Sequence, residues 1–232
     1  MAPIHATEAT RQQLIADLCA HEFFRTLDDA RLARLADAAV CHRFAAGEVI
    51  FLEGDDAAAA LWIVNAGRVK VYKLSPEGVE YIVHLFGPGD AFNEVAALDG
   101  GPAPANAAAI SDVTACCLDH AAIVALVEQD PALALTLVNI ATSHTRILLK
   151  QIEELALYSV VVRMARFLLT HAENPAFSGP GVTRSTIAAH LATTPETVSR
   201  ALSKLENIGV LQVDRHEIVV INEEGLRLIA QF

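Results

Sequence analysis

The sequence predicts an α+β fold with an N-terminal β jelly roll, one long helix and a C-terminal winged helix-turn-helix. Short strand-like segments separated by turn residues fill about residues 41–117, which is typical of an antiparallel barrel or jelly roll. One helical stretch then runs unbroken through 131–158, and the end of the chain alternates helix, turn, helix, hairpin and helix. We therefore expect three domains, spanning 1–130, 131–158 and 159–232.

The composition is that of a folded chain, and the length fits one large or two modest cores. The 232 residues are 53% hydrophobic and 19% charged, which excludes an intrinsically disordered protein. Four cysteines without regular spacing exclude a disulfide-dense secreted scaffold. Cys116 and Cys117 are adjacent in a strand-like segment, so we expect them to point to opposite faces as buried structural residues. A redox role is the alternative.

No targeting or membrane-spanning pattern is evident in the sequence. The N-terminus lacks the basic and apolar regions of a signal peptide, and no uninterrupted apolar run reaches about 18 residues. We therefore expect a cytoplasmic protein that does not enter a membrane.

The negative charge is unevenly distributed along the chain. The formal net charge is −11, and residues 1–158 account for all of it, with 10 basic and 21 acidic side chains. Residues 159–232 hold 7 of each and are neutral. Nucleic acids attract basic surfaces, but a neutral domain can still sort its charges between its faces. The overall charge therefore does not exclude a nucleic-acid partner.

Helices precede and follow the strand-rich region. Apolar residues at helical spacing predict helices over 8–20 and 28–39. The clearest strands are rich in Val, Ile, Phe and Tyr and are separated by turns that contain Gly or Pro: 48–53, 61–65, 69–74 and 79–86. A further strand-like segment ends at Leu118, and 119–129 predicts a short helix.

The long helix has a strong start signal and then continues for about 40 Å. Asp130 can cap it, Pro131 can occupy its first turn, and nothing interrupts the pattern before Tyr158. Its apolar residues exceed one stripe, which predicts one face against the jelly roll and another against a second copy of the helix. An ordinary core helix in a monomer is the alternative. The positions predicted for this dimer helix are Leu137, Ile140, His144, Leu148, Ile152 and Leu155.

Residues 183–221 predict two short helices joined by a tight turn and followed by a small hairpin. Ile187 and Leu191 lie four residues apart on the first helix. Thr194 can cap the second helix and Pro195 can occupy its first turn. In a winged helix-turn-helix this second helix lies in the major groove of DNA, with its N-terminal residues at the base edges.

The polar face of the second helix carries side chains suited to reading bases. Arg200 can donate two hydrogen bonds to guanine, and Glu196 can accept one from the amino group of cytosine. Ser199 can donate, accept or contact a thymine methyl group. The positions predicted to contact phosphates are Arg184, Thr194, Lys204 and Arg215. A plain solvated face is the alternative, because an i,i+4 acid–base pair supports many helices.

No catalytic motif occurs in the sequence. A nucleophile elbow, a P-loop, an HExxH motif and zinc-type cysteine pairs are all missing, so we expect no enzyme and assign no metal ligand. The alternative from another class is an effector-binding regulatory subunit that acts on a partner protein and not on DNA.

Several motifs occur in a characteristic order around the long helix: Gly87-Pro-Gly-Asp90, Phe92-Asn-Glu94 and Thr194-Pro-Glu-Thr-Val-Ser-Arg200. Together they resemble the cyclic-AMP receptor protein/FNR (Crp/Fnr) family of bacterial transcription regulators over about residues 15–228. The resemblance implies a sensor domain like the cyclic-nucleotide-binding domain, a dimerisation helix and a DNA-binding domain in an allosteric homodimer. It also implies RNA polymerase as a partner if the protein is an activator.

The recognition helix resembles one branch of that family. Glu196, Ser199 and Arg200 form the pattern Glu-x-x-Ser-Arg, which is similar to the FNR-type branch and implies the half-site TTGAT. A two-fold dimer then implies the palindrome TTGAT-N4-ATCAA, with half-sites about one helical turn apart.

The sensor matches the family only in part. Glu94 aligns with the glutamate that binds the ribose of a cyclic nucleotide, and Leu148 and Leu149 align with a base-contacting hydroxyl pair. These three residues are the candidate effector pocket. Asn93 replaces the family's glycine, and 102–110 contains no basic residue for the cyclic phosphate. A buried phosphodiester needs a cationic partner, so we expect an effector other than cyclic AMP.

Two other sensor chemistries occur in the family, and the sequence fits them differently. An iron–sulfur sensor needs an N-terminal cysteine cluster, whereas Cys19 and Cys41 are isolated, so no such cluster is expected. Residues 72–78 and 92–94 resemble the nitric-oxide-sensing haem branch (Dnr type), which leaves haem as the candidate cofactor. The histidines that could supply a ligand include His21, His42, His84 and His144, and none is assigned.

Overall fold

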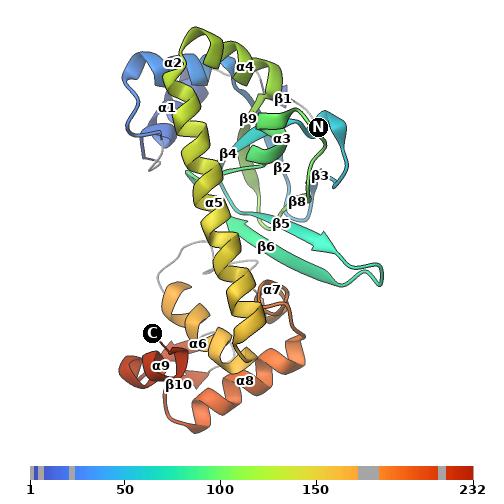
Figure 1. The fold of residues 1–232 in the computed structure, drawn as a ribbon, viewed down its shortest axis with the longest axis vertical. Helices are drawn as coiled ribbons and strands as arrows, with labels where there is room; N and C mark the ends of the chain where they lie inside the picture. Colours follow the sequence, from blue (N-terminus) through green and yellow to red (C-terminus); the bar gives the residue numbers. More distant parts are fainter. Residues whose placement is uncertain (1–2, 5–7, 21–23, 172–182, 214–217, 232) are drawn as a thin grey trace. The chain divides into compact units, whose positions relative to one another are not determined.

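The computed structural model describes residues 3–4, 8–20, 24–171, 183–213 and 218–231. These residues pack as two units (Figure 1). The sensor unit comprises Met1–Lys73 and His84–Ile147, and the C-terminal unit comprises Leu74–Val83 and Leu148–Phe232. The division falls inside the long helix and differs from the predicted three domains, whose boundaries stay a prediction.

Two antiparallel sheets form the β-rich region, which confirms the predicted jelly-roll architecture. One sheet has the order β1 (Pro3–Ile4), β2 (Val40–Phe44), β9 (Val113–Asp119), β4 (Ala60–Ala66) and β7 (Ala91–Phe92). The other has the order β3 (Val49–Phe51), β8 (Asn106–Ala109), β5 (Val69–Leu74) and β6 (Glu80–Phe86). The single segment predicted to end at Leu118 is thus two strands, β8 and β9, which lie in different sheets.

Alternation along β4 separates two hydrophobic cores. Leu61 and Ile63 point to a core that is shared with helices, whereas Trp62 and Val64 point to the space between the two sheets. The helices of the first core are α1 (Glu8–Ala20), α2 (Asp29–Ala38), α4 (His120–Gln129) and α5 (Ala132–Leu157). A short helix that the sequence did not predict, α3 (Glu94–Asp99), follows β7.

The cysteines occupy both faces of the first sheet. Cys41 on β2 lies directly opposite Cys116 on β9, and the two buried residues form a disulfide bond. Cys117 points to the other face, as predicted from the strand alternation, and burial raises the pKa of its thiol to about 11. Cys19 is exposed and free. The pairing of Cys41 was not predicted, because 75 residues separate it from Cys116.

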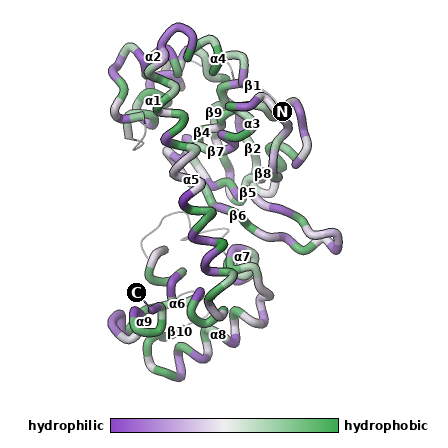
Figure 2. The backbone as a smooth tube through the Cα atoms, viewed as in Figure 1, coloured by the Kyte–Doolittle hydropathy of each residue, from purple (hydrophilic) through white to green (hydrophobic). Residues whose placement is uncertain are grey.

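The long helix α5 begins where two arginines hold Asp130. Arg31 Nε lies 2.6 Å and Arg34 Nη2 lies 2.7 Å from Oδ2 of Asp130. The hydrogen bond from Arg31 is the largest cause that lowers the pKa of Asp130 to about 2, so this carboxylate is ionised at neutral pH. These ion pairs join the start of α5 to α2. The predicted range of the long helix is confirmed, and Figure 2 shows hydrophobic residues recurring along α5.

The C-terminal unit contains the predicted winged helix-turn-helix. Its elements are α6 (Val160–His171), α7 (Arg184–His190), α8 (Pro195–Asn207), β10 (Leu211–Val213), β11 (Ile218–Val220) and α9 (Glu223–Ala230). Their core includes Met164, Val198, Leu205 and Leu226, which are fully buried. The predicted loop over 174–181 lies outside the described residues.

Candidate nucleic-acid interface

Local signals position the second helix of the helix-turn-helix. Thr194 caps α8, since its Oγ1 accepts a hydrogen bond from the backbone N–H of Thr197 at 3.3 Å, and Pro195 occupies the first turn. The inward face buries Val198 and Leu205 in the core of the unit. The predicted cap and start of this helix are therefore confirmed. Ile208, predicted on the apolar arc with Val198 and Leu205, is instead 55% exposed at the end of the helix.

The first helix begins with a similar cap. Thr183 Oγ1 accepts a hydrogen bond from the backbone N–H of Thr186 at 3.2 Å, and the Thr186 hydroxyl accepts from the backbone N–H of Thr183 at 3.2 Å. The turn between α7 and α8 passes through Ala192, whose φ of 48° lies in the left-handed region. This tight turn joins the two helices through only a few residues.

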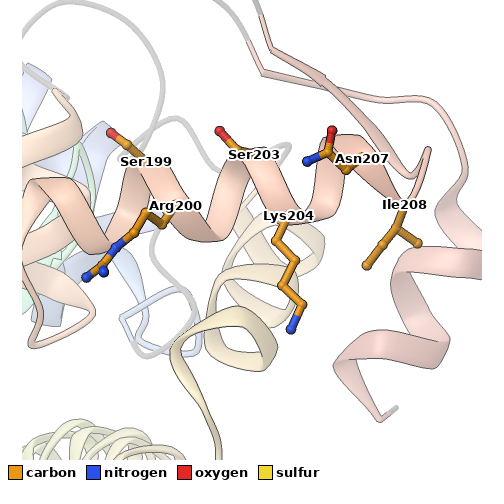
Figure 3. A pocket seen from close by; sticks show the side chains of 6 residues that line it. All are labelled: Ser199, Arg200, Ser203, Lys204, Asn207 and Ile208. Atoms are coloured by element: carbon orange, nitrogen blue, oxygen red, sulfur yellow. The ribbon is translucent and has the colours of Figure 1, made fainter.

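The outward face of α8 forms a shallow surface groove with two rows of side chains (Figure 3). One row holds Ser199, Ser203 and Asn207, and the other holds Arg200, Lys204 and Ile208. The residues of each row lie four apart, which is the spacing of neighbours on one helical face. The predicted site residues Ser199, Arg200 and Lys204 thus lie together. Ser203 and Asn207, which helical periodicity also places on the polar face, line the same surface.

Hydrogen bonds orient two of the predicted base-reading side chains. Ser199 Oγ donates to the carbonyl oxygen of Pro195 at 3.0 Å, which leaves its oxygen able to accept from a base. Arg200 Nη2 donates to Oγ1 of Thr197 at 3.1 Å. Because a guanidinium carries five N–H groups, Arg200 retains donors for a guanine.

Glu196, the third predicted base-reading residue, lies exposed in the first turn of α8. A hydrogen bond from its own backbone N–H lowers the pKa of its carboxyl group, and the Thr194 hydroxyl and the charge of Arg200 lower it further. The carboxylate is therefore an acceptor at neutral pH, as contact with a cytosine amino group requires.

The predicted phosphate-contacting residues are only partly described. Arg184 and Lys204 are exposed on α7 and α8. Thr194 is also exposed, and its hydroxyl serves as the cap of α8. Arg215 lies outside the described residues. Contact of these four residues with phosphates stays a prediction.

In the sensor unit, Glu94 of the predicted effector pocket is paired with a histidine. His144 Nδ1 on α5 lies 2.8 Å from Glu94 Oε1, and both side chains are largely buried. Leu148 and Leu149 belong to the C-terminal unit, where both are exposed. A pocket built from Glu94 and these two leucines stays a prediction.

The residue before Glu94 has the backbone conformation of a glycine. Asn93 has a φ of 66°, and its side-chain amide donates to the carbonyl oxygens of Ala58 and Ala60 at 2.8 and 2.9 Å. Asparagine is among the few non-glycine residues that adopt this conformation readily. The backbone at this position therefore accepts asparagine in place of glycine. The side-chain amide uses its donors on two backbone carbonyls of the jelly roll.

One basic side chain from another strand approaches residues 102–110, the stretch that contains no basic residue of its own. Lys73 Nζ on β5 donates to the carbonyl oxygen of Pro104 at 2.9 Å. It also pairs with Glu53 Oε1 at 2.5 Å, so a carboxylate already neutralises its charge.

Aromatic side chains occupy the space between the two sheets. Phe92 is fully buried, with ring centroids 5.3 Å from Phe86, 6.1 Å from Phe51 and 6.3 Å from Trp62. His42 is buried beside Trp62, at a centroid distance of 5.5 Å. The chain's own side chains thus pack this interior.

His84, another of the four histidines considered as ligands, lies near the Glu94–His144 pair. The ring centroids of His84 and His144 are 6.4 Å apart, and the Phe86 ring lies 4.6 and 5.6 Å from them. His21 lies outside the described residues. No group of three or more His, Cys, Asp or Glu side chains suited to a metal ion occurs in the part of the chain that the structure describes.

The faces of α5 correct part of the predicted dimer seam. Leu137 and Ile140 are buried in the sensor's own core, with Ile140 1% exposed, and His144 pairs with Glu94. These three positions therefore point toward the sensor and are not available to a second chain. Leu148, Ile152 and Leu155 are exposed, as a seam requires. The stripe that continues from these three residues toward the start of α5, at alternating spacings of three and four, is called the α5 seam, and pairing along it stays a prediction: Val138, Ala141, Thr145, Leu148, Ile152 and Leu155.

Comparison with known proteins agrees with both units. Residues 41–130 match the cyclic nucleotide-binding domain, and residues 162–229 match the Crp-like helix-turn-helix domain. The chain is 25% identical over 210 residues to the CRP-like cAMP-activated global transcriptional regulator of Mycobacterium tuberculosis, covering 88% of this chain and 93% of that one. It is 30% identical over 170 residues to the cyclic AMP receptor protein of Thermus thermophilus, covering 72% and 77%. The structure of FixK2 from Bradyrhizobium japonicum matches with a TM-score of 0.70 at 28% identity, covering 82% of this chain and 96% of that one.

Proposed function

Because the chain belongs to the Crp/Fnr family of transcription regulators, we propose that it binds a palindromic operator as a homodimer under the control of an effector other than cyclic AMP. The family makes the protein a DNA-binding transcription regulator. The outer face of α8, with Glu196, Ser199 and Arg200, is the observation that carries the finer proposal. Such a regulator acts in the cytoplasm and, if it activates transcription, contacts RNA polymerase.

The proposed operator is TTGAT-N4-ATCAA, read by one α8 in each half-site. Arg200 would donate two hydrogen bonds to the guanine, and Glu196 would accept from the cytosine paired with it. Arg184, Thr194, Lys204 and Arg215 would contact phosphates and set the register without reading sequence.

Removing the Arg200 guanidinium tests this reading. Arg200→Ala is expected to lower affinity for the palindrome about 5- to 150-fold and to relax the preference at the guanine, because a bidentate base contact contributes about 1–3 kcal/mol. Fluorescence anisotropy with a labelled duplex at fixed salt measures the change.

Arg227→Ala is the matched control, because it removes an equal charge from α9, where Arg227 pairs with Glu223. It is expected to leave the preference for the palindrome intact. Unchanged affinity in Arg200→Ala would contradict the DNA contact and favour a regulatory subunit that acts on a partner protein.

The homodimer would form along the α5 seam. On length and composition α5 could also cross a membrane. However, Leu133, Leu137 and Ile140 are buried in the sensor, and the exposed apolar residues Val138, Leu148, Ile152 and Leu155 follow a heptad spacing. This arrangement supports pairing between two copies of α5 in water. We propose that the effector biases two arrangements of this dimer and thereby reorients residues 183–208.

The contacts in the sensor support an effector other than cyclic AMP. Glu94 is already paired with His144, and Lys73, the basic residue beside Pro104, is paired with Glu53. A cyclic phosphate would have to displace a carboxylate from Lys73 or remain without a cationic partner.

Haem stays the candidate cofactor because two imidazoles lie together beside an apolar ring. His84 and His144 could each offer a nitrogen to iron, and Phe86 packs against both. Bound haem would supply an iron that takes nitric oxide.

Adding haemin to the purified protein tests this candidate. Wild type is expected to give a saturable Soret band at one haem per chain, and His144→Ala is expected to weaken it. His120→Ala is the control, since the His120 ring hydrogen-bonds to the carbonyl of Ala97. A spectrum identical to free haemin would exclude haem as the cofactor.

A further inference from the structure

Side-chain hydroxyls link the cap of α8 to the guanidinium of Arg200. The Thr194 and Thr197 hydroxyl oxygens lie 3.2 Å apart, and Thr197 Oγ1 accepts from Arg200 Nη2 at 3.1 Å. Thr194 is itself held by its bond from the Thr197 backbone N–H at 3.3 Å. The hydrogen bonds therefore run from the start of the helix to the end of the Arg200 side chain.

Arginine needs such a constraint if it is to read one base well. Its side chain has several rotatable bonds, and the entropy of fixing them opposes binding. A guanidinium already held in one orientation loses less entropy when it meets a base, so the contact becomes tighter and more selective. The bond from Nη2 to Thr197 uses one donor and leaves the others for the base edge.

We propose that Thr197 is a positioning residue that sets the guanine preference of Arg200. The half-buried Thr197 fixes the orientation of the guanidinium before DNA binds and acts on base selection through Arg200. This inference rests on the proposed contact between Arg200 and guanine.

The first helix supplies a built-in comparison. Thr183 and Thr186 repeat the arrangement of Thr194 and Thr197, with hydroxyl oxygens 3.1 Å apart and the same bond from backbone to cap. The residue three positions after Thr186 is Ala189, whereas three positions after Thr197 stands Arg200. Thr186→Val thus removes a hydroxyl from a helix cap without touching an arginine at this spacing.

The experiment compares Thr197→Val, Thr197→Ser and Thr186→Val in the full-length protein. The probes are the duplex TTGAT-N4-ATCAA and the duplex TTAAT-N4-ATTAA, in which both guanine–cytosine pairs are replaced. The measured quantity is the ratio of the two affinities at fixed salt. Thr197→Val is expected to lower this ratio about 2- to 10-fold, the range for one lost hydrogen bond, while Thr197→Ser retains it. Thr186→Val is expected to keep the wild-type ratio.

A double-mutant cycle separates positioning from direct contact. If Thr197 acts through Arg200, Thr197→Val is expected to change nothing further in the Arg200→Ala background. Equal losses in both backgrounds would show that Thr197 touches DNA itself and would overturn the proposal. A wild-type ratio in Thr197→Val would also overturn it.

Failure of the proposed function gives a different result. If wild type binds the two duplexes equally, the guanine contact itself is wrong and the role of Thr197 falls with it. If wild type discriminates and Thr197→Val discriminates equally well, only the role of Thr197 is wrong. Thermal unfolding of Thr197→Val and Thr197→Ser, expected to stay close to that of wild type, shows that the fold is intact.

Discussion

Ile152→Glu is expected to convert the proposed dimer into monomers and to abolish binding to the palindrome. Ile152 is 62% exposed and lies between Leu148 and Leu155 in the C-terminal half of the α5 seam. In a two-fold dimer its substitution would bury two carboxylates against each other, which costs several kcal/mol and raises the dimer dissociation constant by about 100-fold or more. A monomer reaches only one half-site and loses the gain from simultaneous binding.

Analytical ultracentrifugation over a concentration series and anisotropy with the palindrome measure these two losses. Leu157→Glu is the matched control, because Leu157 is 70% exposed on the same helix but lies outside the α5 seam. It is expected to remain a dimer and to bind the palindrome as wild type does. A dimeric Ile152→Glu protein would show that the chains associate elsewhere.

Removing the Cys41–Cys116 disulfide is expected to lower the free energy of unfolding by about 4 kcal/mol, because the bond closes a long loop in the unfolded chain. The two residues are 75 apart in sequence. For a domain of this size the loss corresponds to a decrease in Tm of about 10 °C. The measurement is thermal and urea unfolding of Cys41→Ala/Cys116→Ala under oxidising conditions.

Cys117→Ala is the control, since Cys117 is a free, half-buried neighbour on the same strand. It is expected to unfold close to wild type. Alkylation of the denatured, unreduced protein should label two of the four cysteines, Cys19 and Cys117. Four labelled cysteines, or equal Tm values for the disulfide variant and Cys117→Ala, would contradict a stabilising bond.

The disulfide also lies in the hydrophobic core against which the long helix packs. Cys41 and Cys116 share a cluster with Leu133, Leu137 and Ile140 of α5. Loss of the disulfide is therefore expected to loosen the packing of α5 against the sensor core, and so to weaken both dimerisation and binding to the palindrome. Oligomeric state and palindrome affinity of the disulfide variant measure this second effect.

Elements with strong local signals were predicted closely. The cap Thr194 precedes α8 as expected, and the long helix has its predicted range. β8 was not separated from its neighbour, because its sequence Asn-Ala-Ala-Ala has low strand propensity and becomes a strand through pairing with β3 and β5. The short helix α3 was not predicted, because its six residues are too few to show a helical period and it follows an asparagine with positive φ instead of a usual cap.

The class of fold, the helix-turn-helix and the polar outer face of α8 could be predicted from the sequence, because caps, turns and helical periodicity depend on neighbours within a few residues. The stripe of α5 that meets the sensor could be read only from the folded structure, in which Leu137, Ile140 and His144 of the predicted seam face the sensor core. The disulfide between Cys41 and Cys116 and the pair of Glu94 with His144 likewise form only in the folded chain. These contacts depend on strand register and helix packing between distant segments, and no local pattern encodes them.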